Sequence, residues 1–251
     1  MTEMPGWRHP LSWRATEFEF RNRFWIIMAT YCLGFGCYTW DHMNVSVALT
    51  RAILGSLDSP LAYPWLRTIF AVGALIVTLV ALMRSWAAAY LHSAVVHDSE
   101  LHSDRLVADG PYRRVRNPLY LGNILLAVGL GLMASRTGFL VLVIGTVPFV
   151  YRLILCEEAH LLESHGDGYR RYFETVPRLW PSLRPGVPAS GARPNWLAGC
   201  VGEAFMWSIA IGMAVFDVTL RLMHFWIIMG AGFAVYFVHA WLRNRRTAAG
   251  R

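Results

Sequence analysis

The stretch DGPYRRVRNPLYLG, residues 109–122, carries a polar, arginine-rich loop directly into an apolar run. Gly110-Pro111 fixes a turn, and Pro118 suits the first turn of a helix. Apolar residues continue over 119–135 and, after a turn of a few residues, over 137–155. The sequence therefore predicts a membrane hairpin of two helices, with both feet at the side of the polar loop.

A second polar segment follows this hairpin at once. It begins with Glu157-Glu158 and ends with Val176-Pro177-Arg178. A carboxylate placed just after a membrane span needs a partner or a ligand. On a helix, Glu157 and Glu158 point about 100° apart, so the pair offers two directions for contacts. We expect the two polar segments to lie side by side at one membrane face, and we place the active site there.

The composition fits a membrane protein. The chain has 251 residues, of which 55% are hydrophobic and 16% charged, whereas soluble domains carry about 25% charged residues. Four more apolar runs, at 24–40, 67–83, 196–216 and 224–241, bring the expected spans to six. The predicted fold is all-α: a polytopic membrane helix bundle of about six transmembrane helices.

The distribution of arginine predicts the orientation. Net charge is +7, and arginine supplies every basic residue. Arginine gathers in the N-terminal tail, in 84–117, in 157–195 and in the C-terminal tail, whereas the opposing loops carry little. By the positive-inside rule, both termini are cytoplasmic. This topology also explains the basic excess without nucleic acid. The absence of lysine beside many Ala and Gly residues is typical of a GC-rich bacterial genome, so we expect a bacterial inner membrane.

The chain divides into three expected parts. Residues 1–83 form the N-terminal tail and the first two spans, 84–182 form a core with the two polar segments, and 183–251 form a linker, two further spans and a basic tail. A metal centre is not predicted, because the five-residue spacing of His92, His97 and His102 turns successive side chains about 140° apart on a helix.

The loop at 109–122 has the groups that hold an anion. A helix start offers N–H groups and a positive dipole end, here beside Arg113, Arg114 and Arg116. Tyr112 and Tyr120 can stack on a flat base or face a cation. The alternative is a basic interfacial loop with its tyrosines in the aromatic belt.

Five motifs occur in a fixed order around the hairpin. They are Gly110-Pro111-Tyr112, Arg116-Asn117-Pro118-x-Tyr120-x-Gly122, Glu157-Glu158-x-x-Leu161, Tyr169-x-x-Tyr172 and Val176-Pro177-Arg178-x-x-Pro181. In order, spacing and intervening hairpin, they resemble the isoprenylcysteine carboxyl methyltransferase and phospholipid methyltransferase family, over roughly residues 84–182. The resemblance implies an integral-membrane enzyme that binds S-adenosylmethionine at the cytosolic face and methylates a lipophilic acceptor. Many members have His where this chain has Asn117, so a titrating base at 117 is not expected.

The resemblance also implies site residues. Those expected to bind the cofactor are Tyr112, Arg116, Asn117, Pro118, Tyr120, Gly122, Glu157 and Glu158. Glu158 and Arg116 are the expected catalytic residues, with Glu158 as a base where an ammonium acceptor must lose a proton. Tyr169, Arg170 and Arg178 are expected to bind the acceptor.

The expected activity is methyl transfer to an isoprenylcysteine-type carboxylate, a phospholipid amine or a thiol. One alternative is a membrane sterol or enone reductase that uses the reduced nicotinamide dinucleotide phosphate, because Arg113 and Arg114 would suit a 2′-phosphate. The other is a membrane scaffold without enzymatic activity. The sequence does not predict the oligomeric state.

Overall fold

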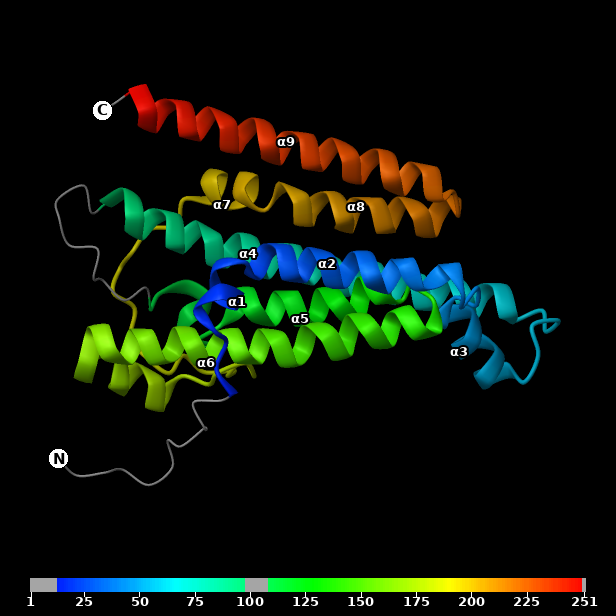
Figure 1. The fold of residues 1–251 in the computed structure, drawn as a ribbon, viewed down its shortest axis with the longest axis horizontal. Coiled ribbons are helices and arrows are strands. Elements are labelled where there is room, and N and C mark those ends of the chain that lie inside the picture. The colour runs from blue at the N-terminus through cyan, green and yellow to red at the C-terminus, as the bar shows by residue number, and fades with distance from the viewer. Residues whose placement is uncertain (1–12, 98–107, 250–251) are drawn as a thin grey trace.

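A computed structural model describes residues 13–97 and 108–249 (Figure 1). Within these ranges the structure contains helices and no β-strand. The α-helices are α1 (Glu17–Arg21), α2 (Arg23–Gly36), α3 (Val45–Leu54), α4 (Ala62–His97), α5 (Pro118–Gly131), α6 (Arg136–Thr175), α7 (Trp196–Gly202), α8 (Ala204–Thr219) and α9 (Leu222–Ala249), and two short 3-10 turns are η2 (Cys37–Thr39) and η3 (Gly110–Arg113). The expected all-α class is confirmed.

Helix α4 forms the centre of the bundle. It packs against α5 on one side and against α7 and α8 on the other, while α6 covers α5 and α9 covers α8 (Figure 1). The main core lies where these helices meet and includes Val77, Val80, Leu126, Leu130 and Met213, all buried. Helix α2 completes the bundle by packing on α6.

The expected count of six spans is not confirmed. Among the described helices, α4 over Ala62–Leu91 and α6 are long and apolar enough to cross a membrane, and α7 with α8, bent by 65°, can count as a third. The expected span at 119–135 is shorter than predicted, because α5 ends at Gly131 and a tight turn follows. Its 14 residues reach only about 21 Å, against a hydrocarbon core of roughly 30 Å.

Large apolar side chains lie exposed along the bundle. Examples are Leu75 and Leu79 on α4, Leu140 and Ile144 on α6, and Ile227 on α9. Soluble monomers rarely expose apolar surface over several helices. This surface suits contact with lipid, in agreement with the apolar helices that could cross a membrane.

Glycines let helix backbones approach closely at two contacts. Gly129 of α5 meets α4, where an added Cβ would lie 2.9 Å from Val77 and 3.2 Å from the carbonyl oxygen of Gly73. Gly138 of α6 meets α2, and a Cβ there would lie only 2.2 Å from the carbonyl oxygen of Gly34. Close packing through small residues is a common means of helix association in membranes.

Gly138→Ala should destabilise the protein by about 1–3 kcal/mol, because α2 must move away from α6 to admit the methyl group. Thermal unfolding in detergent would measure the effect. Gly36→Ala is the matched control, because a Cβ at Gly36 meets no atom within 4 Å. Equal unfolding midpoints for the two variants would contradict this packing.

Candidate active site

The two polar segments lie side by side at one end of the bundle, as predicted. Backbone N–H groups of Arg116 and Asn117 donate to the carbonyl oxygens of Pro177 and Arg178, at 2.8 and 3.3 Å. Ser182 donates in the same way to Arg114, at 2.9 Å. These bonds satisfy polar backbone that has no helical partner. The loop before α5 is therefore held against the chain that returns from α6.

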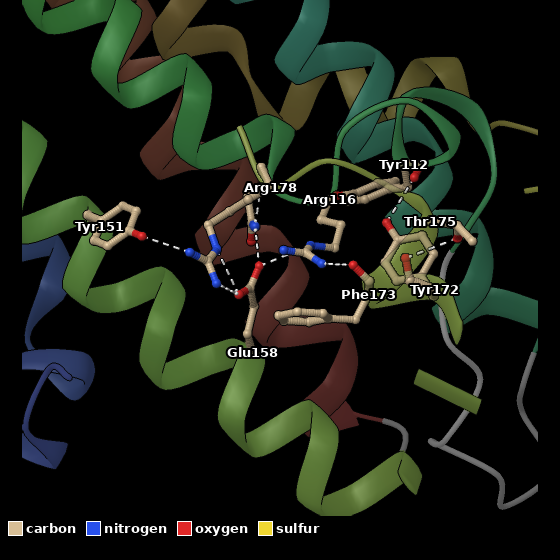
Figure 2. A network of polar contacts seen from close by, with 9 residues as sticks. Tyr112, Arg116, Tyr151, Glu158, Tyr172, Phe173, Thr175 and Arg178 are labelled. Atoms are coloured by element: carbon tan, nitrogen blue, oxygen red, sulfur yellow. Dashed lines mark hydrogen bonds and ion pairs between the residues drawn. The ribbon is translucent and has the colours of Figure 1, made fainter. Parts of the chain in front are cut away.

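Glu158 lies at the centre of this contact. Its carboxylate accepts hydrogen bonds from Nδ2 of Asn117, at 3.0 Å, and from Nε of Arg178, at 2.9 Å, and forms an ion pair with Nε of Arg116, at 3.1 Å (Figure 2). The side chain of Glu158 is only 4% exposed. We call these four residues the Glu158 cluster. A buried carboxylate is tolerated here because two guanidinium groups compensate its charge.

The two arginines of the cluster are held differently. Arg178 also donates to the hydroxyl of Tyr151, at 2.7 Å, whereas Arg116 donates to the carbonyl oxygen of Phe173 and stacks on its ring, 3.7 Å from the ring centroid (Figure 2). Burial lowers the pKa of both guanidinium groups. At Arg178 the hydrogen bond and the charge of Glu158 outweigh burial, so the pKa of Arg178 is raised overall. At Arg116 burial prevails and the pKa is lowered.

One donor of Arg116 is buried and has no hydrogen-bond acceptor among the described residues. Nε of Arg116 is close to Glu158, but its N–H does not point along a hydrogen bond to any acceptor in the described part of the chain. Such a buried polar atom is uncommon in a folded protein. The side chain of Asn117 is engaged by Glu158 and Arg178 and does not cap α5. The N–H groups at the start of that helix are therefore available for a ligand.

Glu157 is oriented away from the Glu158 cluster. It is half-buried and interacts with the hydroxyl group of Tyr120 on α5. No arginine of the described ranges lies within ion-pair distance of it. Tyr112 lies nearby: burial, together with the negative charges of Glu157 and Glu203, raises the pKa of its hydroxyl above the usual range, against the opposing charge of Arg84. The two neighbouring glutamates thus face two different environments.

A family model for phospholipid methyltransferase matches residues 66–168, which include most of α4, all of α5 and most of α6. Residues 66–168 belong to the phospholipid methyltransferase family. The suspected family is therefore confirmed over this region, which we call the methyltransferase-family region.

Two curated relatives extend the comparison. The chain is 31% identical over 140 residues to the nickel-cobalt-cadmium resistance protein NccN of Alcaligenes xylosoxydans xylosoxydans, covering 55% of this chain and 62% of that protein. It is 28% identical over 182 residues to the cobalt-zinc-cadmium resistance protein CzcN of Cupriavidus metallidurans, covering 70% and 72%. The chain thus spans less than two thirds of NccN. No solved structure gives a significant match.

Several residues of the predicted motifs have structural roles in the methyltransferase-family region or directly after it. Pro118 occupies the first position of α5, and the hydroxyl of Tyr172 donates to the carbonyl oxygen of Tyr112, at 2.8 Å (Figure 2). Tyr169 is buried beside Tyr172 and Val176. Gly122 faces α4, where a Cβ would lie 2.8 Å from Cγ of Arg84. Its role is therefore to admit an arginine side chain.

The three residues expected to bind the acceptor are not brought together. Arg178 belongs to the Glu158 cluster, and Tyr169 lies in the small core under the loop. Arg170 is exposed and forms an ion pair with Asp167, at 3.5 Å, on the surface of α6. Gly166, with φ of 54° and ψ of −128°, interrupts α6 just before Asp167 and Arg170.

Tyr151, Arg84 and Glu203 were not identified from the sequence. The signal for Arg84 is present in the sequence, since a charged residue inside a continuous apolar helix requires a counter-ion. No pattern in the sequence names Glu203 as that counter-ion.

The other loop residues anchor the linker that follows α6. Arg113 donates to the carbonyl oxygen of Val187, at 2.9 Å, and Arg114 donates to those of Ser182 and Leu183. The carboxylate of Asp109 accepts from the hydroxyl and N–H of Ser190 and from the N–H of Ala192. Both arginines expected to favour a 2′-phosphate are therefore engaged by backbone oxygens.

Asp109→Asn should destabilise the protein by about 1–2 kcal/mol at pH 7. Burial raises the pKa of Asp109, but the hydrogen bonds from Ser190 and Ala192, with the charge of Arg113, lower it overall from the ordinary 3.8. Stability from this carboxylate is therefore present above pH 3.8 and is lost as the pH falls through the lowered value.

Thermal unfolding of Asp109→Asn and of the unaltered protein, measured from pH 7 to pH 3, would test this dependence of stability on pH. The difference between their midpoints should narrow at the acid end, while Asp167→Asn, at a side chain that is 95% exposed, should behave like the unaltered protein. A difference that is constant with pH would contradict the assignment.

Proposed function

We propose that this chain is an integral-membrane methyltransferase that transfers a methyl group from S-adenosylmethionine to a lipophilic or small acceptor. The main support is the division of Glu157 and Glu158 inside the methyltransferase-family region. One carboxylate is occupied by Arg116, Asn117 and Arg178, and the other faces two tyrosines beside the start of α5. This arrangement combines a rigid support with an accessible acidic group.

The donors and acceptors at this end of the bundle fit the cofactor. S-adenosylmethionine has a carboxylate, an ammonium group, ribose hydroxyls and a flat adenine. The uncapped N–H groups at the start of α5 suit the carboxylate. Glu157 suits the ammonium or the ribose hydroxyls, and Tyr112 and Tyr120 suit the adenine.

When bound, the cofactor supplies an activated methyl group on a sulfonium. The residues of the chain then have to orient the reactants and exclude water. We propose that Asn117 and Arg116 hold their positions through Glu158, so that Glu158 acts mainly as a positioning residue. Proton removal by Glu158 would require its three protein contacts to break. A carboxylate or thiolate acceptor needs no base, and Arg170 on the exposed side of α6 is available for an anionic head group.

The proposed setting is the bacterial inner membrane, with six spans and both termini in the cytoplasm. Arginines in the loops at the site's end of the bundle support this orientation through the positive-inside rule. Residues 84–182 would form the core that holds the cofactor, and the helices of 183–251 would pack on that core. The engagement of Arg113 and Arg114 by backbone oxygens counts against the reductase alternative.

A methyl-transfer assay would test this function. Membranes that contain the protein, given radiolabelled S-adenosylmethionine and bacterial lipid extract, should release S-adenosylhomocysteine and label an acceptor. Label in the organic phase that mild base releases as methanol identifies a carboxyl ester, label that resists base identifies an amine, and volatile label with added thiols identifies a thiol. Absence of labelled product in every fraction would count against the activity.

The names of the two relatives support a physiological setting. Both are named for resistance to cobalt and cadmium, with nickel or zinc in addition. We propose that methyl transfer by this chain protects cells exposed to such metals. Cells that lack the gene should grow poorly in cadmium, and the unaltered gene should restore growth where the Glu157→Gln gene does not. Equal rescue by the two genes would show that protection against the metal does not depend on methyl transfer.

A further inference from the structure

A second buried ion pair joins helices that are distant in the sequence. Arg84 of α4 donates from Nε to Oε2 of Glu203, at 2.7 Å, and from one terminal nitrogen to Oε1, at 3.0 Å. Glu203 lies at the bend between α7 and α8. The side chains are 15% and 11% exposed. Such a two-point pair fixes the direction of the guanidinium as well as its charge.

The remaining terminal nitrogen of Arg84 reaches the start of α5. It donates to the carbonyl oxygen of Leu119, at 2.9 Å, and to Oδ1 of Asn123, at 2.8 Å. Gly122 gives the arginine room to pass, because a Cβ there would lie 2.8 Å from Cγ of Arg84. Arg84 therefore connects the bend at Glu203 with the first turn of α5.

That first turn follows directly on Arg116 and Asn117 of the Glu158 cluster. We infer that Glu203 is a positioning residue of the proposed cofactor site, which it supports by orienting Arg84 against α5. The inference rests on the proposed function. Glu203 lies outside the methyltransferase-family region, so the C-terminal helices of this chain contribute to a site whose other residues lie in or next to that region.

The docking of α7 and α8 on α4 has further contacts that do not involve Arg84. Gly199 lies directly on the backbone of α4, where a Cβ would be 2.6 Å from the carbonyl oxygen of Ser85. The indole nitrogen of Trp207 donates to Oγ of Ser85, at 2.9 Å. Trp207→Phe removes a hydrogen bond from the same interface that involves neither Arg84 nor α5, which makes it a matched control.

Calorimetric titration of the full-length protein in detergent with S-adenosylhomocysteine would test the inference. Glu203→Gln should weaken binding about tenfold or more, and Glu203→Asp should restore part of the loss. Asn123→Ala keeps the ion pair but removes one acceptor for Arg84, and should weaken binding roughly threefold to tenfold. Trp207→Phe should bind within about twofold of the unaltered protein.

Several results would overturn the inference. Unchanged affinity in Glu203→Gln and Asn123→Ala would show that α5 does not depend on Arg84. An equal loss in Trp207→Phe would show a general effect of loosened packing. If Glu203→Gln does not fold, Asn123→Ala compared with Trp207→Phe decides the question. If the unaltered protein does not bind, the proposed function fails, and this inference fails with it.

Discussion

Glu158→Gln should lower the stability of the protein by about 3–5 kcal/mol, the range seen when one member of a buried ion pair is removed. The amide would leave Arg116 and Arg178 facing one another without a buried counter-charge. Asn117 would lose one acceptor as well. Because the same contacts hold the loop before α5, cofactor binding should be lost together with stability.

Thermal unfolding in detergent would measure this change. Glu163→Gln, an identical substitution at an exposed position of the same helix, should leave the midpoint unaltered. A normal midpoint for Glu158→Gln would show that the Glu158 cluster does not hold the two polar segments together.

Glu157→Gln should weaken cofactor binding without lowering the stability of the protein. We expect a roughly tenfold to hundredfold loss of affinity for S-adenosylhomocysteine, since one charge-assisted hydrogen bond to the ligand's ammonium or hydroxyls would be weakened. The unfolding midpoint should stay close to that of the unaltered protein, because no described arginine depends on Glu157. Calorimetric titration and thermal unfolding of the same preparation would measure both quantities.

The contrast between the two variants is the informative result. Loss of stability in Glu158→Gln and loss of binding alone in Glu157→Gln would separate support from ligand contact. A stable Glu157→Gln protein with full affinity would exclude Glu157 from the cofactor site.

The sequence predicted the position of the site better than the roles within it. The order of loop, hairpin and second polar segment was enough to place Arg116, Asn117 and Glu158 together. Helical geometry placed Glu157 and Glu158 in two directions, but it could not show which direction meets the arginines. That depends on how residues 176–182 turn back along the loop, which is a tertiary arrangement with no local pattern.

Other features could not be predicted from the sequence for similar reasons. Arg84 and Glu203 are 119 residues apart in the chain, and only the packing of α7 and α8 on α4 makes them partners. The glycines of α5 are recognisable in the sequence as positions for close helix packing. The sequence does not show that Gly122 and Gly129 face α4. Span counting also overestimated α5, because apolar residues continue through the turn after Gly131 and do not mark where the helix ends.

Titration of purified, detergent-solubilised protein with S-adenosylhomocysteine, beside an identical titration with the reduced nicotinamide dinucleotide phosphate, tests the central claim most directly. We predict saturable binding of S-adenosylhomocysteine at one site per chain and no binding of the dinucleotide. Binding of the dinucleotide alone, or of neither compound by protein that unfolds cooperatively, would contradict the proposed methyltransferase function.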